Sequence, residues 1–222
     1  MKDIILWGAT GQAIALEEFL GASGYKLAAV FDNNETVKSP FKSVPIYHGA
    51  DGFHNWMSGR KDCREVNYIV AIGGNRGEDR ENIYKMLASS GLRGVSIVHP
   101  SAFVASSVSV GNGCQILANA AVCARVRLGS VTIVNTSASI DHECIIGRGA
   151  HIAPGATLAG CVKVGDYSLI GAGSVVLPRI QIGKRTIIGA GSVVIQNIPD
   201  NVVAYGNPAR IVRDNNQLLS NH

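Results

Sequence analysis

The most constraining feature of the sequence is an aliphatic residue at every sixth position over nearly a hundred residues. A period of six fits neither the 3.6-residue turn of a helix nor the two-residue alternation of a long strand. It indicates a repeat whose unit is one short strand followed by one turn. Val, Ile or Leu occupies the whole series: Val98, Val104, Val110, Ile116, Val122, Leu128, Val134, Ile140, Ile146, Ile152, Leu158, Val164, Ile170, Val176, Ile182, Ile188 and Val194.

The other positions of the six-residue unit agree with this interpretation. The residue two before each aliphatic one is uncharged and small or aliphatic, from Ala102 to Ile198. Glycine follows the aliphatic residue at positions 111, 129, 147, 165, 171, 183 and 189, where we expect the backbone to turn with positive φ. Three units close a triangular coil, and stacked coils pair their backbones at about 4.8 Å per layer. The sequence therefore predicts a parallel β-helix of about five to six coils.

Before residue 98 the pattern changes to alternating strands and helices. We predict strands at residues 4–7, 27–31, 44–47, 68–72 and 95–98, and helices at 13–22, 50–57 and 78–89. This order is typical of a small α/β, Rossmann-like domain with a parallel sheet. We therefore expect two domains, the first over residues 1–98 and the β-helix over residues 99–222.

Three segments of the first domain follow predicted strands and should meet at one edge of its sheet. They are residues 8–12, Asp32 and residues 73–75, and open α/β sheets bind ligands at this edge. The glycine-containing turn at 8–12 would let the backbone and the next helix N-terminus approach a phosphate, while Asp32 could bind a ribose or a base. A turn required only for packing remains the alternative. A dinucleotide dehydrogenase is not expected, because the sheet is small and has no second half.

Composition narrows the partners and the compartment. Apolar residues make up 46% of the chain, charged residues 16%, and the net charge is only +4. No basic run with interleaved aromatics predicts nucleic-acid binding, and no apolar stretch is long enough to span a membrane. Of five cysteines, Cys114 and Cys144 fall at inward positions of the repeat. We expect free thiols and therefore a cytoplasmic protein.

Two histidines of the coil are candidate catalytic residues. His142 follows the inward Ile140 in the string Asp141-His142-Glu143-Cys144, so it lies at an outward or corner position. Neighbouring carboxylates favour the imidazolium and raise the basicity that a general base needs. His151 lies half a coil further on, so the two imidazoles meet only across a subunit boundary, as in a cyclic trimer. A solvated surface histidine remains the alternative for each.

The string from Val134 to Cys144, followed by His151-Ile152-Ala153-Pro154-Gly155-Ala156, resembles the nucleotide-sugar acetyltransferases of the hexapeptide-repeat superfamily. The most similar are N-acetyltransferases of UDP-linked bacillosamine precursors, with sialic acid O-acetyltransferases and GDP-perosamine N-acetyltransferases nearby. The resemblance implies a left-handed β-helix, a homotrimer with active sites between subunits, acetyl-CoA as co-substrate, no metal, and a role in polysaccharide biosynthesis.

The resemblance also implies roles for individual residues. His142 would take a proton from the acceptor amine, Glu143 would make it more basic, and His151 would lie by the acetyl thioester, where it or a backbone N–H could stabilise the oxyanion. The acetyl-CoA arm would pass small residues, and a guanidinium would bind its phosphates: Gly160, Ala172, Gly173, Ala190 and Arg210. The acceptor's nucleotide would lie near Gly8, Thr10, Gly11, Gln12, Asp32, Asn33 and Gly73. The chain departs from many relatives in having Gln12 where they have histidine.

These residues predict acetyl transfer to the amino group of a nucleotide-linked 4-amino-4,6-dideoxy sugar. Three alternatives stay open at this point. One is O-acetylation of a sugar such as sialic acid, and another is a non-catalytic trimeric scaffold. The third is a γ-type carbonic anhydrase, which would need three histidine ligands, whereas the coils contain only His142 and His151.

Overall fold

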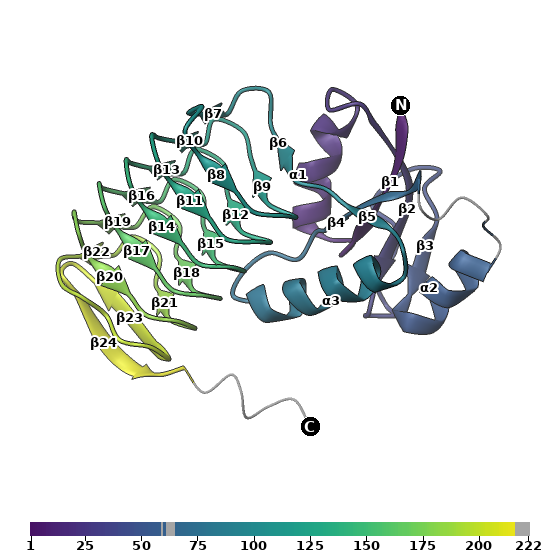
Figure 1. Ribbon diagram of the computed structural model, residues 1–222. Coiled ribbons are helices and arrows are strands. Elements are labelled where there is room, and N and C mark those ends of the chain that lie inside the picture. The colour runs from purple at the N-terminus through teal and green to yellow at the C-terminus, as the bar shows by residue number, and fades with distance from the viewer. Residues whose placement is uncertain (59, 61–64, 216–222) are drawn as a thin grey trace.

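The first domain of the computed structural model is a five-stranded parallel sheet with helices on both faces (Figure 1). The structure describes residues 1–58, 60 and 65–215. The sheet order is β3-β2-β1-β4-β5. The elements are β1 (Lys2–Trp7), α1 (Gly11–Leu20), β2 (Tyr25–Asp32), β3 (Ile46–His48), α2 (Gly49–Ser58), β4 (Asn67–Val70), α3 (Gly77–Ser89) and β5 (Arg93–Gly94). No helix among the described residues has the length and apolar character needed to cross a bilayer.

The alternating pattern of the sequence therefore predicted these helices and most strands within a few residues. Apolar side chains of α1 cover one face of the sheet, and those of α2 and α3 cover the other. The predicted strand at 95–98 is only partly right. Residues 93–94 form β5 at the sheet edge, whereas β6 (Ile97–Val98) pairs with the coil. The β-helix thus begins two residues before the predicted boundary, because the backbone of β6 finds its partner in the next coil.

Residues 97–194 form a left-handed parallel β-helix with two-residue strands on three sheets (Figure 1). Paired strands lie one coil apart, as with Ser139 and Thr157. The aliphatic residue of each unit is the second residue of its strand, as the period predicted, and from Ile116 onward these side chains are buried. The remaining strands are β7 (Phe103–Val104), β8 (Ser109–Val110), β9 (Gln115–Ile116), β10 (Ala121–Val122), β11 (Arg127–Leu128), β12 (Ile133–Val134), β13 (Ser139–Ile140), β14 (Ile145–Ile146), β15 (His151–Ile152), β16 (Thr157–Leu158), β17 (Lys163–Val164), β18 (Leu169–Ile170), β19 (Val175–Val176), β20 (Gln181–Ile182), β21 (Ile187–Ile188) and β22 (Val193–Val194).

The expectation that the glycine after each aliphatic residue has positive φ is wrong. Positive φ occurs two residues later, at positions such as Glu143 (φ 59°) and Tyr167 (φ 61°), most of which are not glycine. Most of these residues donate their N–H to the coil below, as Glu143 does to the Ala124 carbonyl at 2.9 Å. The glycine after the aliphatic residue is needed for close approach instead. A Cβ at Gly147 would lie 2.5 Å from the backbone nitrogen of Asp166 in the next coil.

A β-hairpin closes the far end of the coil, and the sequence pattern did not predict it. Strand β23 (Val202–Gly206) pairs in parallel with β21, and β24 (Ala209–Asp214) pairs with β23 in the antiparallel sense. Val202, Ala204 and Ala209 contribute side chains to the coil core. The hairpin, yellow in Figure 1, thus covers apolar surface that the last coil would otherwise expose.

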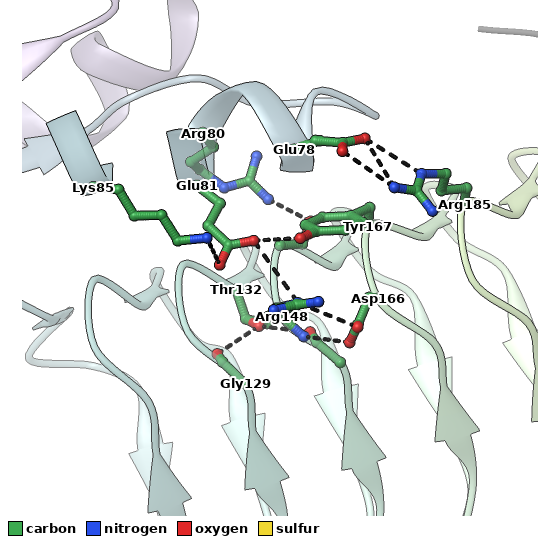
Figure 2. A network of polar contacts seen from close by, with 12 residues as sticks. Glu78, Arg80, Glu81, Lys85, Gly129, Thr132, Arg148, Asp166, Tyr167 and Arg185 are labelled. Atoms are coloured by element: carbon green, nitrogen blue, oxygen red, sulfur yellow. Dashed lines mark hydrogen bonds and ion pairs between the residues drawn. The ribbon is translucent and has the colours of Figure 1, made fainter. Parts of the chain in front are cut away.

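Helix α3 fixes the first domain to the side of the coil through charged side chains (Figure 2). Arg80 is fully buried, and its guanidinium donates to the carbonyls of Ile72, Val131 and Gly149 at 2.7 Å each. Burial lowers the pKa of Arg80 to about 10, so the side chain stays charged at neutral pH.

Two flanking contacts extend the same interface. Glu78 binds Arg185 with a shortest N–O distance of 3.1 Å, and Glu81 accepts from the hydroxyl of Tyr167. Lys85 also binds Glu81 at 2.8 Å from within the same helix (Figure 2). Because these contacts join α3 to several successive coils, the sheet edge of the first domain is held at a fixed place beside β15.

Candidate active site

A pocket of about 760 Å³ opens at the carboxyl ends of the strands of the first domain. The structure brings together there all seven residues predicted to lie near the nucleotide: Gly8, Thr10, Gly11, Gln12, Asp32, Asn33 and Gly73. The N-terminal end of α3 completes the wall with Arg76, the residue before the helix, and with Asp79 and Asn82 of its first turns, all of which sequence reasoning missed. A helix beginning directly after the glycine turn at 73–74 was the signal that could have found them.

The backbone around this pocket is open to an anion. Thr10 precedes the first turn of α1, and no side chain caps the free N–H groups of that turn. Unpaired N–H groups at a helix N-terminus attract phosphate oxygens. Gly8, at φ 107°, packs against the Ala71 carbonyl so closely that no side chain would fit. The pocket floor therefore suits a diphosphate.

Asp32 has a more structural place than the sequence suggested. One carboxylate oxygen accepts from the backbone N–H of Ala9, and the other accepts from that of Asn34, each at 2.9 Å. The side chain thereby ties the turn after β1 to the loop after β2. Each oxygen keeps a second lone pair, so a ribose or base contact remains compatible with this arrangement.

His151 comes from the coil but lines this same pocket. Its Nδ1 lies 3.2 Å from the Gly74 carbonyl, and its Nε2 lies 3.0 Å from Nδ2 of Asn135. A carbonyl only accepts, so Nδ1 carries the proton and Nε2 accepts from Asn135. Burial, and to a lesser degree the nearby Arg80 cation, lowers the pKa of His151 to about 4.

The neutral state of His151 changes the role expected for it. With the proton on Nδ1, the ring has no hydrogen on Nε2 to donate toward an oxyanion. The expectation that this imidazole could stabilise the tetrahedral intermediate therefore does not fit the arrangement. The amide of Asn135, which keeps a second N–H, is the donor in its immediate surroundings.

His142 occupies an exposed corner of the coil, just after β13. Its Nδ1 lies 3.2 Å from a carboxylate oxygen of Glu143, and about half of each side chain is exposed. Since the carboxylate accepts from Nδ1, the lone pair of Nε2 is free to take a proton. Gly160 lies one coil further, directly against the ring, where a Cβ would come within 2.7 Å of Cε1. This pair thus has the geometry that a general base and its orienting carboxylate would need.

The small residues predicted to line the acetyl-CoA arm are on two different edges of the coil. Gly160 shares the corner of His142, after the six-stranded sheet. The exposed residues Ala172, Gly173 and Ala190 lie on the corner after the eight-stranded sheet. Arg210 is exposed on the closing hairpin. A single chain therefore brings His142 and Gly160 together but not the remainder of the set.

Comparison with known proteins assigns the whole chain to a family. The family of bacterial transferase hexapeptide repeats matches residues 161–196. The crystal structure of PerB from Caulobacter crescentus, in complex with CoA and GDP-perosamine, is 32% identical with a TM-score of 0.85, over 96% of this chain and 98% of that one. The chain belongs to the hexapeptide-repeat nucleotide-sugar acetyltransferases. The predicted family, fold and enzyme class are thereby confirmed.

Two further solved structures are similar to the chain over nearly its whole length. The acetyltransferase domain of PglB from Neisseria gonorrhoeae is 27% identical with a TM-score of 0.83, over 96% of this chain and all of that one. WeeI from Acinetobacter baumannii, at 23% identity and a TM-score of 0.82, shares the fold. No curated protein matches the chain in sequence.

Membership of this acetyltransferase family argues against two of the alternatives, the non-catalytic trimeric scaffold and the γ-type carbonic anhydrase. An acyltransferase is not a non-catalytic scaffold. Among the described residues the one cluster of three possible metal ligands is His142, Glu143 and Cys161, which is not the three-histidine set of a γ-type carbonic anhydrase.

Proposed function

We propose that the protein transfers the acetyl group of acetyl-CoA to the amino group of a nucleotide-linked 4-amino-4,6-dideoxy sugar. The observation that carries this proposal is the likeness, over nearly the full length of both chains, to PerB with CoA and GDP-perosamine bound. The pocket of the first domain and the His142–Glu143 pair supply the two parts that such a reaction needs.

The mechanism that we propose uses these two parts. The diphosphate binds at the N-terminus of α1 and directs the sugar toward the coil. Nε2 of His142 takes the amine proton as the nitrogen attacks the acetyl carbonyl, and Glu143 holds Nδ1–H and stabilises the imidazolium. The tetrahedral intermediate then expels the CoA thiolate, which recovers the proton. Holding both substrates in line supplies much of the acceleration.

The active site is complete only in a homotrimer, with each site between two subunits. Two edges of one chain carry the predicted residues, and cyclic packing brings different edges of neighbouring coils together. Exposed apolar side chains on the outer face of the six-stranded sheet and its corner support such packing: Phe103, Val175, Leu177 and Ile195. Light scattering on the purified protein tests this point, and a monomer that retains full activity would refute it.

We place the protein in the cytoplasm and its product in polysaccharide biosynthesis. Buried free thiols support a reducing compartment, and burial raises the pKa of Cys114 and Cys144 to about 11, which keeps them protonated and unreactive. Acetyl-CoA and nucleotide sugars are both available there.

The test is thiol release from acetyl-CoA across UDP-, dTDP- and GDP-linked 4-amino-4,6-dideoxy sugars, with free sialic acid for comparison. Turnover with one nucleotide amino sugar, abolished in a folded His142→Ala variant, is the expected result. Turnover on sialic acid alone would transfer the assignment to O-acetylation. Full activity of the His142→Ala variant would remove the proposed base.

A further inference from the structure

A chain of two side-chain amides connects the sheet of the first domain to the pocket floor. Gln115 is the first residue of β9 and is fully buried, and its Nε2 donates to the Val70 carbonyl at 2.8 Å. Its Oε1 accepts from Nε2 of Gln12 at 2.7 Å. Gln12 lies in the first turn of α1 and lines the pocket. A coil residue thus holds a pocket residue of the first domain.

The hydrogen-bond donors and acceptors around the two amides allow only one orientation of each. The Val70 carbonyl can only accept, so Gln115 must present its Nε2 to it and its Oε1 to Gln12. Gln12 must then donate through Nε2, and its Oε1 is left facing the pocket. A Cβ at Gly73 would lie 3.6 Å from this oxygen. Within the described part of the chain, Oε1 of Gln12 accepts no hydrogen bond.

The surroundings of this oxygen indicate which part of a ligand meets it. On one side the free N–H groups of α1 suit phosphate oxygens, which a carbonyl oxygen would repel. On the other side, across Gly73, lies the imidazole of His151, which a Cβ at Gly73 would approach to 3.8 Å. In a nucleotide sugar bound in this way, the group between the diphosphate and the coil would be the sugar ring. The fixed acceptor therefore requires a donor on that ring.

We propose that Gln12 determines sugar specificity by accepting a hydrogen bond from a hydroxyl or amide N–H of the hexose ring, and that Gln115 is the positioning residue that fixes this acceptor. The inference rests on the proposed function, since it takes a nucleotide-linked sugar as the occupant of the pocket. An orientation set by a buried partner favours ligands with a donor at this place, because a sugar lacking it leaves Gln12 unpaired.

The first experiment compares nucleotide-sugar affinity with nucleotide affinity in Gln12→Met, which keeps the side-chain length and removes the acceptor. The KM for the accepted nucleotide amino sugar should rise about tenfold, as expected for one hydrogen bond, with kcat nearly unchanged. Calorimetric binding of the nucleoside diphosphate alone should not change. Gln181→Met, an exposed substitution on β20 away from this pocket, is the matched control. An unchanged KM, or an equal loss of nucleoside diphosphate affinity, would overturn the proposal.

The second experiment tests the positioning role of Gln115. Gln115→Leu leaves the amide of Gln12 intact but removes the Oε1 that accepts from its Nε2, so the Gln12 acceptor loses its fixed orientation. KM should rise in this variant as well, whereas a simple need for any acceptor predicts no rise. Combining Gln12→Met with Gln115→Leu should raise KM no further than the stronger single change, since both remove one interaction. Additive effects would refute the coupling.

The two proposals fail in distinguishable ways. If the wild-type protein acetylates no nucleotide amino sugar, the proposed function is wrong. The inference about Gln12 is then tested by calorimetry, which compares the affinity for GDP-perosamine with the affinity for GDP. Gln12→Met should lose the part of the affinity that the sugar contributes. If wild-type turnover is found and Gln12→Met leaves KM unchanged, the inference alone is wrong.

A sugar panel separates the two donor types. Analogues that lack the ring hydroxyl next to the anomeric carbon, and analogues that carry an acetamido group there, are compared in the wild type and in Gln12→Met. A variant that no longer distinguishes the deoxy analogue from its parent places the hydroxyl at Gln12. Loss of preference for the acetamido sugar places the amide N–H there. A variant that retains every preference of the wild type refutes the specificity role.

Discussion

Adding a methyl group at Gly160 should displace the ring of His142 without lowering the stability of the coil. The Cβ of Gly160→Ala would lie 2.7 Å from Cε1 of His142 and nearer still to Nε2. Van der Waals contact requires about 3.5–4 Å, so the imidazole must move by about 1 Å. The ring is exposed at its corner and can move outward. The backbone at Gly160 does not have positive φ, so alanine is not strained there.

The expected cost appears in catalysis and not in folding. A displacement of about 1 Å at the reacting group lowers the rate by roughly a hundredfold. The kcat for thiol release from acetyl-CoA should fall by about that factor, while the unfolding temperature stays within a few degrees of the wild type. Gly21→Ala is the control and should leave both quantities unchanged, because its Cβ at the end of α1 would make only an ordinary van der Waals contact, 3.6 Å from Cε of Met1.

The result that would refute this reasoning is a Gly160→Ala variant with wild-type kcat. It would mean that the position of the His142 ring does not limit the reaction. A variant that unfolds would equally contradict the argument, because it would mean that the corner cannot yield by moving the ring alone.

Three further predictions concern stability. Gly147→Ala should lower the free energy of unfolding by about 3 kcal/mol in a urea titration, since its Cβ would meet the rigid backbone of the next coil at 2.5 Å; a loss below 1 kcal/mol would show that the coils can separate. Arg80→Met should cost about 3–5 kcal/mol in the same measurement because buried carbonyls lose their donor, and an unchanged value would contradict the anchoring role of this guanidinium. The folded-state pKa of His151 is lowered to about 4 from an ordinary 6.5, so the unfolded chain binds the proton first as pH falls. Stability is therefore fully present above pH 6.5 and should decline by up to about 3 kcal/mol toward pH 4, and His151→Gln should lack this part of the decline.

The sequence predicted the coil almost residue by residue because burial follows the period. An aliphatic side chain at every sixth position can face inward only if each unit bends at the same place, so the strands were determined by pattern alone. The same pattern did not show why glycine recurs. Gly147 is required by the backbone of the next coil, whereas left-handed φ falls at positions such as Glu143, where the N–H finds a partner below.

Features that depend on contacts between distant segments were beyond the sequence pattern. The hairpin β23–β24 lies after the last aliphatic repeat, so the six-residue period did not predict it. His151 was assigned to the thioester by resemblance, but its place beside Gly74 follows from how α3 docks on the coil. That docking is determined by Arg80 and backbone carbonyls, which have no side-chain signature. For the same reason the partnership of Gln12 with Gln115 was invisible.

Residues 18 positions apart stack on one another, as Ser139 does on Thr157, so the length of the coil grows in fixed steps of one turn. Inserting a whole coil would leave every later residue on its own sheet and would only lengthen the distance from the pocket of the first domain to the far end of the coil. Inserting a single six-residue unit between His142 and Gly160 would rotate all later residues by one sheet, so Gly160 would leave the corner of His142. A chain of this kind can therefore adapt to acyl donors or sugars of different length in two ways. It can gain or lose one full coil, or it can substitute residues within one column of stacked side chains.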